Sequence, residues 1–225
     1  MSPPSTGQDR LPCLIGTARR TWHPGDVAPE PLAMWEEVAR SAARDAGARV
    51  DPLARVDDLS LVHCQSWAYD DAPMRLAERL DLADAHLHES ILAGTSPQRL
   101  LDAAAERMLA GRCEVALVVG GEALATRRAH DRAGEAPDWS HPHPAPPLLP
   151  VDLEQWYLPS EIAHGVLPAW LTFALLEQAR WRARGGREVD RADLAATMHG
   201  LSRVAAGNPD AWFRSPLSLE EISVP

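Results

Sequence analysis

A five-residue apolar run from Val115 to Val119 constrains the fold of this chain more than any other feature. The run contains no polar residue, and Gly120 and Gly121 follow it directly. A run this short, without polar alternation, is typical of a strand that is covered on both faces by other elements. The sequence therefore predicts a buried strand over 115–119, as found in the parallel sheets of layered α/β domains.

The residues before this strand predict a helix over 96–110. Ser96 can accept hydrogen bonds from the first free amides of a helix, and Pro97 suits the first helical position. Gly111 is expected to end the helix. Apolar residues recur at three- and four-residue steps across it, at Leu100, Leu101, Ala104, Met108 and Leu109.

Strands and helices also alternate upstream of this helix. Apolar runs predict strands over 11–16, 59–63 and 85–92, and helical spacing predicts helices over 32–46 and 73–80. Residues 11–121 thus follow the order β, α, β, α, β, α, β. This order predicts an α/β fold, a layered unit with a mixed, mostly parallel sheet.

The character of the sequence changes at Leu124. Residues 127–150 are polar and then rich in proline, which predicts an irregular connection. Helical spacing returns over 166–184, where Trp170 and Trp181 fall on the expected core stripe, and over 190–206. We therefore expect two domains, an α/β domain over 11–125 and a mostly helical insert over 126–225.

Composition excludes several classes of protein. The net charge of −10 argues against general nucleic-acid binding, which needs a basic surface. The first residues lack the order of a signal peptide, and no apolar run approaches the length that spans a membrane. Three widely spaced cysteines, Cys13, Cys64 and Cys113, suggest reduced thiols in a cytoplasmic protein.

Few residues stand out as candidates for chemistry. His86-x-His88 and His141-x-His143 are pairs, whereas a metal needs three or four converging ligands, so we predict no metal site. Cys64 and Cys113 are interpreted as small buried apolar residues. Gly120 and Gly121 suit either close approach of a ligand or tight packing of a helix on the sheet. His164 precedes Gly165 at the edge of a predicted helix and is either a pocket residue or a surface residue.

Several of these stretches together resemble the thiolase superfamily. They are the loop and helix entry Gly94-Thr95-Ser96-Pro97, the strand Val115-Ala-Leu-Val-Val-Gly-Gly-Glu-Ala123, His164-Gly165, Phe173 to Glu177, and Val204 to Phe213. The nearest branch is the sterol-carrier-protein and acetyl-CoA acetyltransferase-like one. The resemblance implies an N-terminal thiolase half followed by a helical insert over the CoA-side pocket.

The resemblance also implies where a site would lie. In thiolases a nucleophilic cysteine begins the helix that here starts near residue 96, and this place is filled by Gly94, Thr95 and Ser96. His164, Gly120 and Gly121 are the residues expected near CoA. In the family, the strand equivalent to 85–92 pairs with its copy in a dimer, and a second half supplies the remaining histidine and cysteine.

Two readings of function follow from the resemblance. In the first, the chain is a thiolase-like acyltransferase-family protein that handles acyl-CoA without any tightly bound cofactor. It is catalytically incomplete as a single chain, forms a homodimer through 85–92 and meets a second subunit that supplies the missing half. In the second, it is a non-catalytic binding or scaffold subunit, or a truncated product. Neither reading includes a nucleic-acid or membrane partner.

Overall fold

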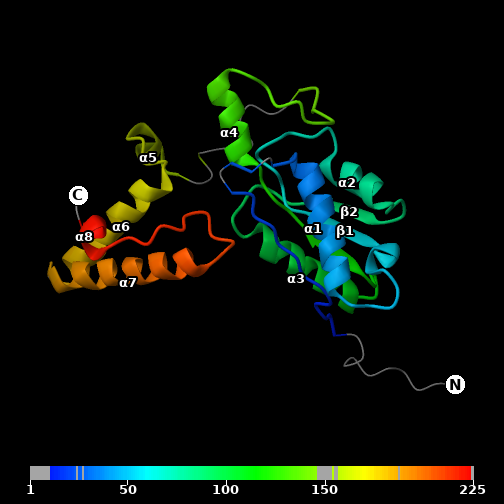
Figure 1. Cartoon of the computed structure of the whole chain (residues 1–225), viewed down its shortest axis with the longest axis horizontal. Coiled ribbons are helices and arrows are strands. Elements are labelled where there is room, and N and C mark those ends of the chain that lie inside the picture. Colours follow the sequence, from blue (N-terminus) through cyan, green and yellow to red (C-terminus); the bar gives the residue numbers. More distant parts are fainter. Residues whose placement is uncertain are drawn as a thin grey trace. The chain divides into compact units, whose positions relative to one another are not determined.

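The computed structural model describes residues 11–23, 25–26, 28–145, 154, 157–186 and 188–223, with no side-chain description for 188–190. The chain divides into two compact units, Met1–Pro150 and Val151–Pro225, and each is described by itself. Figure 1 shows strands and helices in the first unit and helices alone in the second. The domain boundary predicted near residue 125 stays a prediction.

Unit 1 is built on a three-stranded parallel sheet. Its strands are β1 (Asp58–Leu61), β2 (His86–Glu89) and β3 (Ala116–Val119), in the order β2-β1-β3. Leu59 of β1 pairs with Leu87 on one side and Leu117 on the other. The α/β class and the parallel arrangement predicted from the sequence are therefore confirmed.

The strand predicted over 11–16 is wrong. This segment is not part of the sheet, and Leu14 is 77% exposed. It is held by helix α1 (Pro31–Asp45) instead, because the backbone amide of Thr17 donates to Asp45 Oδ2 at 2.8 Å. Gly16 also lies so close to α1 that an added Cβ would come within 2.2 Å of the Ala42 carbonyl oxygen.

Two helices cover one face of the sheet. Helices α1 and α2 (Ala72–Leu80) pack on this face, and the core cluster joins Leu32, Trp35 and Leu76 to Leu59 and Leu61 of β1. Helix α1 begins at Pro31, a residue type suited to the first turn. The helices predicted over 32–46 and 73–80 are thus confirmed, except that Met74 of α2 is exposed.

Helix α3 (Ser96–Leu109) lies on the opposite face. Its Arg107 contacts Asp58 and Ser60, whose side chains alternate with those of Leu59 and Leu61 along β1. The most buried strand is β1, in which all four residues are buried, whereas only Val119 is buried in β3. Helices α1 and α3 also contact β3 from the two faces, as expected for 115–119, but Ala116, Leu117 and Val118 are only half-buried, whereas the central strand β1 is fully buried.

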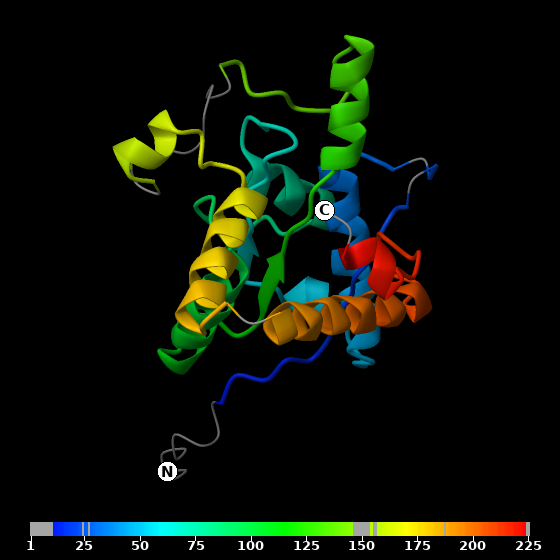
Figure 2. The same ribbon diagram turned by 90° about the vertical axis from the view of Figure 1, so that its left-hand side faces the viewer.

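The connection after β3 is more ordered than its composition indicates. Helix α4 (Leu124–Ala133) occupies part of the predicted irregular stretch, and Figure 2 shows it extending away from the sheet. Further on, Trp67 Nε1 donates to the carbonyl oxygen of Ser140 at 3.0 Å. The backbone amide of His143 also donates to the Ala68 carbonyl oxygen at 2.8 Å.

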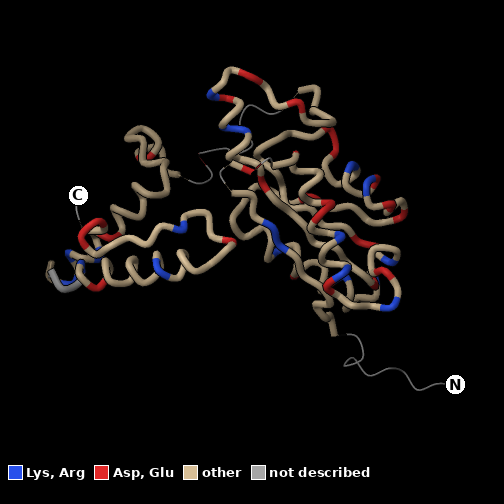
Figure 3. Tube along the Cα trace, viewed as in Figure 1, with Lys and Arg blue, Asp and Glu red and all other residues tan. Residues whose placement is uncertain are grey.

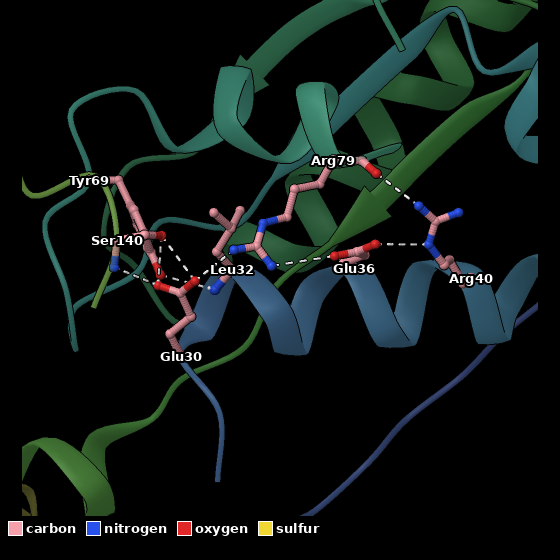
Figure 4. A network of polar contacts seen from close by, with 7 residues as sticks. All are labelled: Glu30, Leu32, Glu36, Arg40, Tyr69, Arg79 and Ser140. Atoms are coloured by element: carbon pink, nitrogen blue, oxygen red, sulfur yellow. Dashed lines mark hydrogen bonds and ion pairs between the residues drawn. The ribbon is translucent and has the colours of Figure 1, made fainter. Parts of the chain in front are cut away.

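A polar network fastens this connection to α1 and α2 (Figure 4). Glu30, the N-cap residue of α1, accepts from the backbone amide of Ser140 at 2.8 Å and from its hydroxyl. The same carboxylate lies 2.7 Å from Arg79 Nη2, and Arg79 also pairs with Glu36. Arg40 in turn donates to the Arg79 carbonyl oxygen at 2.8 Å. One partly buried carboxylate therefore joins three segments that are distant in sequence.

Unit 2 is helical in its described residues. It contains α5 (Pro159–Ala163), α6 (Ala169–Ala183), α7 (Glu188–Gly207) and α8 (Leu219–Ser223), so the two longer predicted helices are confirmed. The predicted core role of Trp170 is wrong, since this side chain is 72% exposed. Apolar residues lie all around α6, and Figure 3 shows a long central part of α7 without charged residues. Within the described residues no helix is both long and apolar enough to cross a bilayer.

Candidate functional site

The carboxyl ends of all three strands lie at one edge of the sheet, because the strands are parallel. In open α/β sheets ligands bind outside this edge. Three segments leave the sheet here, residues 62–66 after β1, 90–95 after β2 and 120–122 after β3. The predicted nucleophile position and the glycine pair fall within or beside these segments.

The predicted nucleophile position holds no activated hydroxyl at Ser96. Thr95 is the N-cap residue of α3, and its side chain makes no capping hydrogen bond. Ser96 is the first helical residue and is 1% exposed, and its Oγ donates to the Ile91 carbonyl oxygen at 2.6 Å. The prediction that Ser96 caps the helix is therefore wrong, because its hydroxyl is committed to the preceding loop. Gly94 is exposed, and no other atom lies within 4 Å of the position that a Cβ would take there.

A histidine and a glutamate that the sequence analysis did not select meet at this edge. His63 Nδ1 lies 2.8 Å from Glu89 Oε1, and both side chains are partly exposed. The hydrogen bond that His63 donates to Glu89 raises the pKa of His63, burial opposes this, and the charges of Glu89 and Glu122 add to the increase. The backbone amide of His63 donates to Ser90 Oγ at 3.0 Å, which joins the β1 exit to the loop after β2.

Glu122 holds the neighbouring loop in place. Its carboxylate accepts from the backbone amides of Gln65 and Ser66 at 2.8 and 2.9 Å, and from Ser66 Oγ at 2.6 Å. Ser66 Oγ in turn accepts from the backbone amide of Ala123 at 2.9 Å. Because the Glu122 carboxylate already accepts these three hydrogen bonds, its main effect is to hold together the segments that follow β1 and β3.

The two buried cysteines are not activated. Burial raises the pKa of the Cys64 thiol to about 11, with the nearby charge of Glu122 adding to the increase. Burial also raises the pKa of the Cys113 thiol to about 12, and the carboxylate of Asp57 contributes further. A thiol reacts as its thiolate, so both residues fit the predicted role as small buried side chains. Cys13 is exposed and unbridged.

Asp57 fixes the start of β3. Its carboxylate accepts from the backbone amides of Glu114 at 2.9 Å and Val115 at 3.1 Å. Burial alone would raise the pKa of Asp57, but these two amides and the Cys113 thiol outweigh it and lower the pKa overall. The ionised carboxylate therefore stabilises the turn between α3 and β3.

Packing accounts for Gly120, the first of the two glycines after β3, but not for Gly121, where a Cβ would lie 3.5 Å from Trp35. A Cβ on Gly120 would lie 2.6 Å from the Val62 Cβ, closer than real contacts allow. Trp35 Nε1 donates to the Gly121 carbonyl oxygen at 3.1 Å, which ties the β3 exit to α1. A further role for Gly120 and Gly121 beside CoA stays a prediction.

The remaining predicted residues lie elsewhere. His164 is the exposed C-cap residue of α5 in unit 2 and precedes Gly165, so its predicted CoA role also stays a prediction. His88 Nε2 lies 3.1 Å from Asp58 Oδ2, whereas His86 is exposed. No group of three or more His, Cys, Asp or Glu side chains that could hold a metal occurs among the described residues.

A buried ion pair positions α3 on the sheet. Asp58 of β1 is 1% exposed at its side chain, and its two carboxylate oxygens lie 2.6 Å from Arg107 Nε and 2.7 Å from Arg107 Nη2. Arg107 Nη2 also donates to Ser60 Oγ at 3.1 Å. A buried charge needs a partner of this kind, so the contact fixes α3 and the loop that precedes it.

Unit 2 contains a groove of about 1030 Å³ between α6, α7 and α8. Arginine side chains line it together with Trp181, whose ring lies under the Arg191 guanidinium at 4.4 Å. Apolar side chains form another part of the wall, including Leu194, Met198 and Ile222. Glu177 and Asp193 also line the groove, and Glu177 lies 3.3 Å from Arg180 Nη1, so the groove combines charged side chains of both signs with aromatic and apolar surfaces.

The small parallel sheet with flanking helices and a helical second unit is a thiolase-like fold. The chain is similar to the crystal structure of a monomeric SCP2-thiolase like protein type 1 from Mycobacterium smegmatis, with a TM-score of 0.70 and 25% sequence identity. The match covers 96% of this chain but only 40% of that one. No protein-family model and no curated protein matches the sequence.

Proposed function

We propose that this chain is a thiolase-fold protein that binds acyl-CoA. The observation that carries the proposal is the likeness to an SCP2-thiolase-like protein over 96% of the chain, since it spans both units. The groove of unit 2 supports it. An acyl-CoA combines phosphates, a purine, an amide-containing arm and an apolar acyl chain, and the groove is lined by arginines and Trp181 for the first two and by apolar side chains for the last, beside Glu177 and Asp193.

The chain alone does not carry out acyl transfer through a cysteine in this proposal. No cysteine begins α3, and Cys64 and Cys113 are buried with raised pKa values. Transfer of an acyl group by a thiolase-like route would therefore need a nucleophile other than these cysteines, together with the histidine and cysteine that the second half supplies in the family. The acyltransferase reading and the binding reading share the same acyl-CoA ligand.

We further propose that two copies associate through β2. This strand pairs only with β1 in the described sheet, so its other edge is available for a ladder with a second copy. Light scattering at micromolar concentration should give a mass twice that of the chain. A mass equal to one chain across that range would refute the homodimer.

The alternative is a non-catalytic scaffold subunit. Large apolar side chains of unit 2 favour it, since Trp170, Phe173 and Phe213 are all more than half exposed. Exposed apolar surface of this kind often marks a place where another polypeptide binds. Under this alternative the second polypeptide binds whether or not acyl-CoA is present.

Calorimetric titration with CoA and acetyl-CoA tests the ligand. Replacement of Arg191 by alanine removes the guanidinium over Trp181 and should weaken binding at least about fivefold, a loss of roughly 1 kcal/mol. Arg203→Ala is the matched control, because Arg203 is exposed on the same helix and does not line the groove. Absence of binding at millimolar CoA, or equal losses in the two variants, would refute this role of the groove.

A further inference from the structure

The His63–Glu89 pair has the geometry of an oriented general base. Glu89 Oε1 lies 2.8 Å from His63 Nδ1, so the carboxylate holds the proton on Nδ1 and leaves Nε2 as the basic nitrogen. No described residue is recorded as a hydrogen-bond partner of Nε2, and the His63 side chain is 29% exposed. The His63 ring is therefore partly accessible to solvent at the carboxyl edge of the sheet.

The surrounding contacts hold this pair rigidly. The backbone amide of His63 donates to Ser90 Oγ, and Ser90 Oγ donates to the Ile91 carbonyl oxygen at 2.9 Å. The same carbonyl oxygen accepts from Ser96 Oγ, so the start of α3 is tied to the loop beside His63. A base held by several fixed segments is preorganised for proton transfer.

Three side chains at this edge, those of Cys64, Ser66 and Ser96, are not free to act as covalent nucleophiles. Cys64 and Ser66 are buried, and Ser66 Oγ is engaged with Glu122. Ser96 Oγ is engaged with the Ile91 carbonyl oxygen. A base without an adjacent activated nucleophile suits the activation of water.

We propose that His63, oriented by Glu89, is a general base that activates water for hydrolysis of an acyl thioester. Nε2 takes one proton as the water oxygen bonds to the thioester carbonyl carbon. The carbon–sulfur bond then breaks, the thiolate leaves, and the imidazolium returns the proton to it. Water and thioester thus give a carboxylic acid and a free thiol, with no oxidant or reductant. Acyl-CoA as the physiological thioester rests on the function proposed above.

The test measures release of free thiol by the whole chain from two substrates. One is an acyl-CoA, and the other is the corresponding acyl N-acetylcysteamine, which lacks the nucleotide and does not need the groove of unit 2. Both should be hydrolysed faster than in buffer alone. His63→Ala should lower the rate at least about a hundredfold, the usual contribution of a general base.

Two further variants separate catalysis from folding. His86→Ala is the matched control, since His86 is exposed and belongs to the same sheet, and it should retain the parent rate. Glu89→Gln keeps a hydrogen-bond acceptor but removes the charge, which leaves Glu122 as the other carboxylate that acts on His63. Because Glu89 raises the pKa of His63, the acidic limb of the pH–rate profile should move to lower pH in Glu89→Gln.

Each outcome decides one of the two proposals. Binding of acyl-CoA without hydrolysis of either thioester would overturn the role of His63 and leave acyl-CoA binding intact. Hydrolysis of the acyl N-acetylcysteamine without binding of CoA would overturn acyl-CoA binding and leave the role of His63 intact. A His63→Ala protein with a native circular dichroism spectrum and an unchanged rate would also overturn the assignment.

Discussion

Replacement of Arg107 by methionine should lower the free energy of unfolding of unit 1 more than replacement of any exposed residue of α3. Methionine keeps most of the length of the side chain but removes the guanidinium, which contacts Asp58 at 2.6 and 2.7 Å. The Asp58 carboxylate would then remain 1% exposed, with only His88 and Ser60 beside it. An uncompensated charge in such a place is costly.

The expected cost follows from this burial. Loss of one partner from a buried ion pair lowers the free energy of unfolding by about 3–5 kcal/mol, and the lower end applies here because His88 remains 3.1 Å from Asp58. With a urea m-value of about 3 kcal/mol per molar, the unfolding midpoint should fall by about 1 M. The double variant Asp58→Asn with Arg107→Met should recover part of the loss, with a coupling energy of about 1–3 kcal/mol.

Urea unfolding followed by circular dichroism measures these values. Arg99→Met is the matched control on the same helix, because Arg99 is exposed, and it should change stability by less than about 0.5 kcal/mol. If Arg107→Met is as mild as Arg99→Met, or if the double variant loses the sum of the two single losses, the pair does not fix α3 to the sheet.

Three further predictions concern packing, thiols and pH. Gly120→Ala should lower the free energy of unfolding by about 1–3 kcal/mol in urea titrations, since its Cβ would meet Val62 at 2.6 Å; an unchanged midpoint would contradict this. Iodoacetamide at neutral pH should label Cys64 and Cys113 no faster in the folded chain than in the denatured chain, measured by mass spectrometry, because their pKa values are raised. Rapid labelling of either, blocked by acyl-CoA, would refute that. The lowered pKa of Asp57 adds stability that is present above its unfolded value of 3.8 and lost as pH falls through the folded pKa, so Asp57→Asn should flatten acid unfolding curves below about pH 4.

The order of elements followed from the sequence, apart from the ends of the α/β unit. Helical spacing and short apolar runs indicated α1, α2, α3 and the three strands, because hydrophobic periodicity is local to each element. The segment 11–16 misled the same reasoning, because an apolar run does not reveal whether its backbone finds a partner. Helix α4 was missed because Leu124 is its only large apolar residue and the rest of it is polar or alanine; none of its residues is buried.

The site was harder to predict than the fold. The absence of cysteine at the start of α3 was visible in the sequence, but the burial of Ser96 was not. His63 and Glu89 were not selected, since neither belongs to a motif. His63 ends the strand predicted over 59–63, but Glu89 falls inside the strand predicted over 85–92, and only the observed end of β2 at Glu89 shows that the two side chains meet.

The sequence by itself determined that this chain forms a parallel α/β layer followed by apolar helices, and that no thiolase cysteine begins α3. Tertiary structure alone decided that β1 is the central strand, that Arg107 neutralises Asp58 and that His63 meets Glu89. The physical reason is that hydrophobic periodicity is a local property of the sequence, whereas contacts between elements join residues that are distant in sequence. Periodicity records which face of an element avoids water, whereas polar pairs between elements depend on strand order and register, which no single element encodes.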